Sequence, residues 1–289
     1  MSNIRNQLLC VGFSISCWEA RRQDKKATKE VAQAHGTDAA VGRYHKDLLP
    51  GATEHEDIIK LRNAWRVWHY ENTLPWGQDG TRVLRSSSFL DYGAEFSNWK
   101  SRFEALCEAL YAAYPTLVAQ AELRLNTLFD ANDYPKVEEV RRRFAVRMNV
   151  STMPNADDFR IIDGIPADQA EQLRIEAVSG LEEQVQAALK DLSGRMYAAV
   201  SAMQARLEIA PGEKGAKFHD SLVENIRELI KRIPKLNLTD DKEIIALSAE
   251  MEELVAHSPL TLREDPLVRN QTADKARALA ARMATYIGE

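Results

Sequence analysis

The feature that most constrains the fold is an apolar pattern at helical spacing within residues 166–208. Its apolar residues follow one another at steps of three or four: Val178, Leu181, Val185, Ala188, Leu192, Met196, Val200, Met203 and Leu207. This spacing is close to a heptad repeat with one extra step of four, which is typical of a helix that packs lengthwise on another. Such a helix would be about 60 Å long, so it needs a second long element beside it.

A second long helix is predicted to return along the first. The turn Ala210-Pro211-Gly212 separates the two, and apolar residues at helical spacing follow it: Phe218, Leu222, Ile226, Leu229 and Ile233. We expect Pro234 to end this helix, because proline has no amide hydrogen to donate inside a helix. Together the two helices predict an antiparallel, coiled-coil-like hairpin.

Two more helices are expected after this hairpin. One covers residues 240–257, with Thr239 or Asp240 as its N-cap, and the other covers residues 271–287, with Thr272 as its N-cap. The chain therefore ends in a run of four helices that can share one apolar core.

The clearest strand lies near the other end, in residues 7–18. Its side chains alternate, with Leu9, Val11, Phe13, Ile15 and Cys17 on one side and smaller residues on the other. Alternation with a period of two is typical of a half-buried strand. A short strand or loop is expected at Thr81–Ser86.

Residues 53–72 and 88–130 are predicted to be helical. Thr53 and Glu56 match a capping box at the start of the first helix. In the second helix we expect a kink or a break at Tyr114-Pro115, because Pro115 cannot donate a helical hydrogen bond.

A third helix is predicted to start at Asp133, with Pro135 in its first turn, and to run through Phe144. Residues 149–165 look irregular. No element is predicted for residues 21–51, which are basic and polar at first and then rich in Gly and Ala.

These elements predict a mainly α protein: a helical bundle with a long antiparallel coiled-coil-like hairpin and a small N-terminal β element. We divide the chain into residues 1–165, a mixed and mostly helical domain, and residues 166–289, the hairpin and the following helices. The two parts could also pack as one domain.

Composition narrows the class of protein. With 45% hydrophobic and 28% charged residues, the 289-residue chain can build a core. Its formal net charge of −5 disfavours a protein that coats nucleic acid. The three cysteines, Cys10, Cys17 and Cys107, indicate reduced thiols in a cytoplasm. No segment is long and apolar enough for a membrane span, so no membrane partner is expected.

The chemistry-bearing motifs of common enzymes are not found. The sequence has no Gly-rich phosphate loop and no HExxH, CxxC or GxSxG pattern. Its six histidines do not pair at metal-ligand spacing on one helix face. The expectation is therefore a protein without catalytic residues, metal or cofactor.

Basic clusters are candidates for nucleic-acid binding. The strongest is Arg141, Arg142 and Arg143, which could contact phosphates. The alternative is a solvated helix face on which these arginines pair with Glu138 and Glu139. A second cluster, Arg21-Arg22 with Lys25-Lys26, leaves the same two alternatives open.

Two other patterns have a functional and a structural interpretation. A dense band of aromatic residues, from Trp65 to Trp99, could stack bases, but its helical spacing favours a packed core. The acidic pair Asp157-Asp158 could donate a carboxylate to a metal in a partner protein, or it could be a solvated turn. The pair Asp240-Asp241 more simply caps a helix.

Short motifs in residues 73–160 carry a resemblance to a known family: Thr73-Leu74-Pro75-Trp76, Gly80 with Val83-Leu84, Tyr114-Pro115, Asp133-Tyr134-Pro135, Phe144, and Met153-Pro154 with Phe159. Leu236-Asn237-Leu238-Thr239-Asp240 and Leu262-Arg263 add to it. The chain resembles a phage and prophage family classed only as a domain of unknown function. Members are often encoded beside MoxR-type AAA+ ATPases and cobaltochelatase-like proteins with a von Willebrand A domain. The resemblance implies no catalytic residues.

Three functions follow as hypotheses. The first is a phage-encoded interaction protein, an adaptor or subunit for the AAA+ ATPase and von Willebrand A system, with Asp157 and Asp158 at the contact. The second is a nucleic-acid-binding accessory protein of phage replication or recombination that uses Arg141, Arg142 and Arg143. The third is a structural protein that assembles with copies of itself through its long helices.

Overall fold

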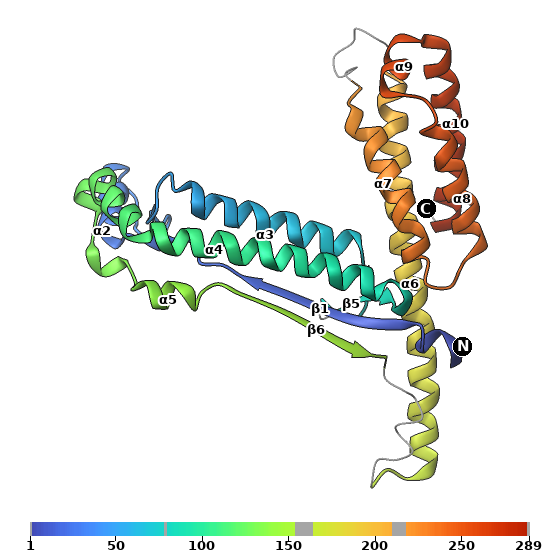
Figure 1. Cartoon of the computed structure of the whole chain (residues 1–289), viewed down its shortest axis with the longest axis horizontal. Helices are drawn as coiled ribbons and strands as arrows, with labels where there is room; N and C mark the ends of the chain where they lie inside the picture. The colour runs from blue at the N-terminus through green and yellow to red at the C-terminus, as the bar shows by residue number, and fades with distance from the viewer. Residues whose placement is uncertain (1, 78–79, 154–163, 210–217, 288–289) are drawn as a thin grey trace. The chain divides into compact units, whose positions relative to one another are not determined.

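The computed structural model describes residues 2–77, 80–153, 164–209 and 218–287 (Figure 1). The protein is 68% helix and 11% strand, so the mainly α fold with a small N-terminal sheet is confirmed. The chain forms two compact units. Unit 1 contains Met1–Gly12, Tyr70–Leu90 and Asn149–Glu289, and unit 2 contains Phe13–His69 and Asp91–Met148. Whether the chain also divides near residue 165 into independently folding domains stays a prediction.

A four-stranded sheet has the order β4-β5-β1-β6, from Leu74–Pro75, Arg82–Arg85, Leu8–Ser16 and Ala145–Thr152. Strands β1 and β5 are antiparallel, with Leu8 opposite Arg85 and Val11 opposite Arg82. The strand predicted in residues 7–18 is therefore confirmed. Of the two alternatives left open for Thr81–Ser86, a strand or a loop, the structure has a strand over Arg82–Arg85.

In unit 1 the helices form a bundle: α6 (Ala167–Leu207), α7 (Asp220–Leu236), α8 (Lys242–Leu254), α9 (Pro259–Glu264) and α10 (Pro266–Ile287). Helix α6 contacts both α7 and α10, and α8 contacts α7 and α10. The apolar stripe of α6 is buried from Val185 to Leu207. Leu8, Cys10, Leu74 and Val83 of the sheet join the same core. The short helix α1 (Ser2–Arg5) also belongs to this unit.

Three predicted helix ends in unit 1 are wrong. Pro234 does not end α7, because the helix continues to Leu236 and its apolar side is buried there. Asp241, rather than Thr239 or Asp240, caps α8 by accepting hydrogen bonds from the amides of Glu243 and Ile244. Thr272 lies inside α10, where its hydroxyl donates to the Val268 carbonyl.

In unit 2 the helices α3 (Thr53–Glu71) and α4 (Phe89–Leu125), which contribute most of their length here, enclose an aromatic core. Trp65 is fully buried, with its ring 5.0 Å from that of Phe13 and 4.9 Å from that of Phe96. The structural interpretation of the aromatic band is thereby confirmed for these residues. The remaining elements are β2 (Arg21–Gln23), α2 (Lys25–Ala34), β3 (His45–Asp47), η2 (Asn126–Leu128), η3 (Ala131–Asp133) and α5 (Val137–Arg141), with η1 (Ser86–Ser88) in unit 1.

Helix ends in unit 2 also differ from the prediction. Pro115 does not break α4. Thr53 is already inside α3, because the Glu56 amide donates to the Ala52 carbonyl, so the predicted capping box does not form.

The helix predicted from Asp133 through Phe144 is wrong for most of its length, since only α5 is an α-helix there. Residues 145–152, of which 149–152 were expected to be irregular, form β6 because they complete the sheet beside β1. The alternation of Val146, Met148 and Val150 with polar residues is the signal that sequence reasoning overlooked.

Candidate functional site

The arginine cluster predicted to bind nucleic acid is partly engaged within unit 2. Arg141 makes two hydrogen bonds to Glu108, of 2.6 and 2.9 Å, and its guanidinium lies 4.2 Å from the centre of the Tyr111 ring. The hydrogen bond from Arg141 lowers the pKa of Glu108. Arg143 lies 5.6 Å from the ring of Trp18, and Arg142 is exposed. Arg141 thus pairs with a residue of α4, rather than with Glu138 or Glu139, the partners expected under the alternative of a solvated helix face.

The other predicted contact residues, Asp157 and Asp158, lie outside the described residues. Their role in partner binding stays a prediction. The second basic cluster, by contrast, lies entirely within the described residues. It belongs to a small substructure of unit 2.

That structure is the basic module, which we define as residues 21–47: β2, α2, the loop 35–44 and β3. Strands β2 and β3 pair antiparallel, with Arg21 opposite Asp47. The module has a formal net charge of +3 in a chain of net charge −5. Its cations outnumber its anions: Arg21, Arg22, Lys25, Lys26, Lys29, Arg43 and Lys46 against Asp24, Glu30, Asp38 and Asp47.

The start of α2 is tied to the end of the loop by Asp24 and Thr28. Oδ1 of Asp24 caps the helix by accepting hydrogen bonds from the amides of Lys26, at 3.0 Å, and Ala27, at 2.9 Å. The Thr28 hydroxyl donates to the Asp24 carbonyl and accepts from the Tyr44 amide. The Asp24 amide in turn donates to the Tyr44 carbonyl. These hydrogen bonds therefore hold the start of α2 and the end of the loop 35–44 together.

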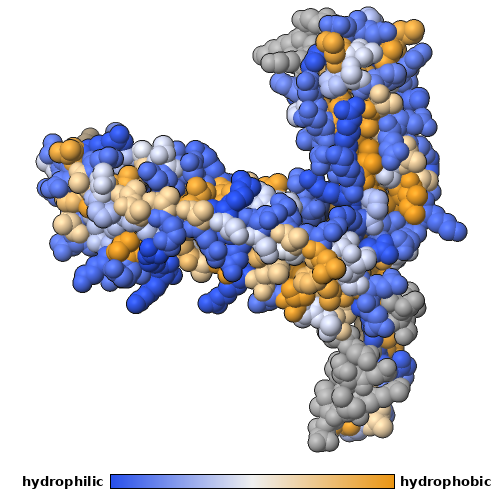
Figure 2. Space-filling view, in the orientation of Figure 1, coloured by the Kyte–Doolittle hydropathy of each residue, from blue (hydrophilic) through white to orange (hydrophobic). Residues whose placement is uncertain are grey.

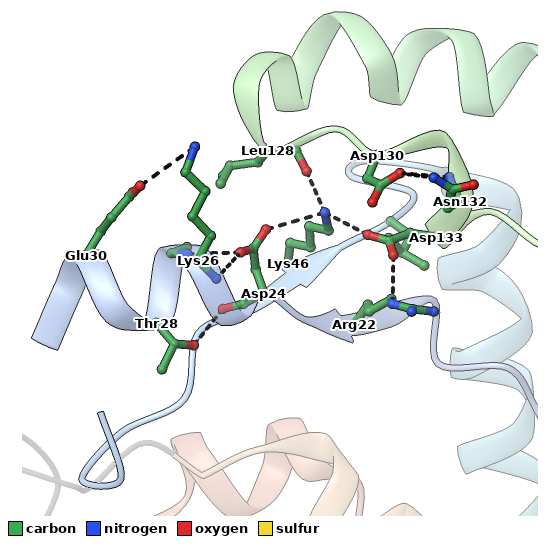
Figure 3. Close-up of polar contacts among 12 residues, drawn as sticks. Arg22, Asp24, Lys26, Thr28, Glu30, Lys46, Leu128, Asp130, Asn132 and Asp133 are labelled. Atoms are coloured by element: carbon green, nitrogen blue, oxygen red, sulfur yellow. Dashed lines mark hydrogen bonds and ion pairs between the residues drawn. The ribbon is translucent and has the colours of Figure 1, made fainter. Parts of the chain in front are cut away.

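A buried lysine connects the basic module to the rest of unit 2. The ammonium of Lys46 lies 2.7 Å from Oδ2 of Asp133 and 3.4 Å from Oδ2 of Asp24, and it donates to the Leu128 carbonyl (Figure 3). The side chains of Lys46 and Asp133 are less than a tenth exposed. Arg22 contacts the other oxygen of Asp133, at 2.7 Å.

The surroundings of Lys46 and Asp24 shift the pKa of each side chain toward its ionised form. Burial alone would lower the pKa of Lys46, but the hydrogen bonds and charges of Asp133 and Asp24 outweigh burial and raise it. The pKa of Asp24 is lowered, first by the hydrogen bond from the Ala27 amide and then by Lys46. Both shifts favour the ionised forms of Lys46 and Asp24.

A hollow of about 340 Å³ lies between α2 and the loop. Its wall is formed mainly by apolar side chains and backbone, among them Val31, Ala32, Val41 and Tyr44. Val31 is 49% exposed and Val41 is 79% exposed, although both are aliphatic. Lys25, Lys29 and Arg43 of the same module are exposed as well. Figure 2 shows hydrophilic residues over most of the visible face, with smaller hydrophobic groups among them. The end that carries α2 has the same mixture.

The loop leaves α2 in a fixed direction. Gly36 follows the helix with φ of +62°, a left-handed conformation that favours glycine. The Thr37 amide donates to the Ala32 carbonyl across this glycine, as in a Schellman ending. Backbone geometry thus fixes the direction of the loop, which forms one wall of the hollow, while α2 forms the other.

The described residues contain no group of three His, Cys, Asp or Glu side chains placed to hold a metal. All three cysteines are free. Burial raises the pKa of Cys17 to about 11 and that of Cys107 to about 12, so both thiols are protonated at neutral pH. In the described part of the chain, no helix is long and apolar enough to cross a membrane.

Comparison with protein-family models, with curated proteins and with solved structures finds no match.

Sequence reasoning noted Arg21-Arg22 and Lys25-Lys26 but missed the module that they belong to. The available signal was Asp24 directly before a short run that favours a helix, with Gly36 after it, which is the usual punctuation of a helix. The pairing of Lys46 with Asp133 had no signal in the sequence, because the two residues are far apart along the chain.

Proposed function

We propose that this chain is a non-enzymatic interaction protein that binds an acidic protein partner through the basic module. The observation that carries the proposal is the net charge of +3 on residues 21–47 in a chain of net charge −5. Clustered charge of one sign steers a partner of the opposite sign and selects against others. The buried network of Lys46, Asp24 and Asp133 keeps the module preorganised, which reduces the cost of binding.

The specific form of this proposal comes from the family resemblance. We propose a phage-encoded adaptor or subunit for a MoxR-type AAA+ ATPase and its von Willebrand A partner. In that assembly Asp157 and Asp158 would supply a carboxylate to the metal site of the von Willebrand A domain. The basic module would supply a second, electrostatic contact.

The long helix α6 offers another surface for the same role. In the fully described stretch from Glu171 to Gln184 none of its residues is buried, and Ile175 is 58% exposed. A coiled-coil-like hairpin of α6 and α7 is part of the proposal: it would present this stretch to a partner, while the stretch from Val185 to Leu207 stays in the bundle.

The test is affinity purification of the tagged full-length chain from phage-infected cells, with mass spectrometry and a nuclease-treated control. We expect recovery of a MoxR-type ATPase or a von Willebrand A protein that survives nuclease. The matched variant carries Lys25→Glu and Lys29→Glu, and its control carries Lys190→Glu on the exposed side of α6. The double variant should lose the partner and the control should keep it. Recovery of the bait alone would contradict the proposal.

A nucleic-acid-binding function has its own supporting observation. The exposed cations Arg21, Lys25, Lys29 and Arg43 lie in the same module as Tyr44, whose side chain is 39% exposed. Cations beside an accessible aromatic ring are what single-strand binding uses. This alternative requires affinity for single-stranded DNA that falls steeply with salt. No gel shift at low salt would remove it.

Self-assembly through the long helices is the third candidate. It requires that the purified chain form oligomers, and a monomer at high concentration in light scattering would remove it.

A further inference from the structure

We infer that the hollow of the basic module is a docking site for one apolar side chain of a short acidic peptide segment in a partner protein. This inference rests on the proposed function and names the kind of segment that the partner must contribute. The recognition chemistry is that of an apolar anchor flanked by carboxylates.

The size of the hollow limits its occupant. A volume of about 340 Å³ lies at the small end of known ligand sites, which span roughly 300–1,000 Å³. It holds a large side chain with part of its backbone, and it is too small for a folded element. The occupant is therefore an extended or turn-like segment rather than a domain surface.

The wall of the hollow favours an apolar occupant over a nucleic-acid base. Three of its polar residues are already engaged: Thr28 bonds Asp24 and Tyr44, Thr37 donates to the Asp38 carbonyl, and the Asp38 carboxylate accepts from the Ala40 amide. The remaining polar side chains of the wall, those of His35, Arg43 and Tyr44, could pair with only part of a base's hydrogen-bonding edge, so the rest of that edge would be buried without a partner, which costs free energy. Covering Val31 and Val41 with an aliphatic or aromatic side chain removes apolar surface from water and so stabilises the complex.

The surrounding charge favours an acidic segment. Lys25 and Lys29 lie one turn apart on α2, whose Thr28, Val31 and Ala32 line the hollow. Arg43 adds a third cation from the loop. Carboxylates of the partner's segment, a few residues before or after the anchor side chain, would pair with these cations.

The site is also preformed. The capping of α2 by Asp24, the left-handed Gly36 and the buried Lys46 hold both walls before a partner arrives. A preformed hollow loses little conformational entropy on binding, so a short segment can bind measurably.

The test uses a fluorescent synthetic peptide of glutamate and aspartate residues with one central leucine, titrated with the full-length chain. The comparison probes are the same peptide with serine for leucine and a single-stranded DNA of similar length. We expect the leucine to tighten binding about tenfold, because burying one leucine side chain contributes that much or more. Competition by the unlabelled leucine peptide should release the probe.

Two matched pairs of variants locate the site. Val31→Asp should weaken binding of the leucine peptide by about tenfold or more. Val67→Asp is its control, because Val67 on α3 is 55% exposed and Val31 is 49% exposed. Lys25→Glu with Lys29→Glu should weaken binding of both peptides, whereas Lys190→Glu should not. Unchanged melting temperatures would show that the variants fold.

The inference is overturned if the serine peptide binds as tightly as the leucine peptide, if Val31→Asp binds like the original chain, or if DNA displaces the peptide from the module. Its failure differs from failure of the proposed function. Recovery of an intact ATPase complex with Val31→Asp would keep the proposed function and remove the hollow from it. If peptide binding requires Val31 but no partner protein is recovered, the docking site is kept and the proposed adaptor function is removed.

Discussion

The ammonium group of Lys46 lies 2.7 Å from Oδ2 of Asp133, and both side chains are almost fully buried. This pair joins the basic module to the segment that follows α4. Because a charge inside a protein needs a partner of opposite sign, the pair determines whether the module keeps its position.

Replacing Lys46 tests this dependence. Lys46→Met keeps the length of the side chain but leaves Asp133 and Asp24 without their shared cation. We expect the free energy of unfolding of unit 2 to fall by about 3 kcal/mol, as when one partner of a buried ion pair is removed. Urea unfolding followed by tryptophan fluorescence reports mainly on this unit, since four of the five tryptophans belong to it: Trp18, Trp65, Trp68 and Trp99.

The control for this measurement is Lys60→Met. Lys60 pairs with Glu56 and Asp57 on the exposed side of α3 in the same unit. Exposed pairs of this kind contribute little, so its midpoint should match that of the original chain. Equal midpoints for both variants would show that the buried network has no special role in stability.

Acid should weaken the module through Asp24. The pKa of Asp24 in the folded chain lies below its ordinary value of 3.8. The stability that its charge contributes is therefore present above that value and is lost as the pH falls through the folded pKa. From about pH 5 to about pH 3 we expect the original chain to lose more stability than Asp24→Asn, which still caps α2 but carries no charge. Parallel losses in both proteins would contradict this assignment.

The extent of the helices was predictable where the apolar pattern is long. Residues 166–208 and 53–72 match α6 and α3 closely, because α3 buries an apolar stripe and α6 buries its own from Val185 to Leu207. Ends were less predictable, since a proline or a capping residue acts locally while packing acts over the whole helix. Pro115 and Pro234 lie inside helices whose buried neighbours, such as Tyr114 and Ile233, hold the backbone in place.

The candidate site was predictable only as a cluster of charge. Arg21, Arg22, Lys25 and Lys26 were visible in the sequence, but their surroundings depend on residues 128–133, which the fold brings to β3. Arg141 shows the same limit. Its partner is Glu108 on α4 rather than a neighbour along the chain, so its pairing could not be read from local spacing.

Removing Pro115 should stabilise unit 2. Pro115 is exposed, so Pro115→Ala leaves no cavity, and the new amide can donate to the Tyr111 carbonyl one turn earlier. We expect a gain of about 1 kcal/mol, because the greater freedom of alanine in the unfolded chain offsets part of the larger helical benefit. Pro135→Ala is the control, since Pro135 lies outside the helices and its replacement should bring no gain in urea unfolding. A loss of stability in Pro115→Ala would show that α4 requires the proline at this turn.

Arg269 holds the end of α6 in unit 1, and its replacement should loosen that end. Its side chain is 4% exposed, and its guanidinium donates to the carbonyls of Arg206, Leu207 and Ile209. A planar group with several donors can satisfy these carbonyls together, whereas an ammonium reaches fewer of them. We expect Arg269→Met to cost unit 1 about 3 kcal/mol, since it leaves several buried carbonyls unpaired, and Arg269→Lys to cost less.

Hydrogen exchange measured by mass spectrometry locates this effect. Amides in the last turns of α6 and the first turns of α10 should exchange faster in Arg269→Met, while those of α3 and α4 in unit 2 keep their rates. Arg277→Met is the matched control on the same helix, because Arg277 is exposed and pairs only with surface carboxylates in the contacts described, those of Glu208 and Asp274. If both variants exchange alike, the end of α6 is held by apolar packing of Leu207 and Leu262, and the buried guanidinium is dispensable.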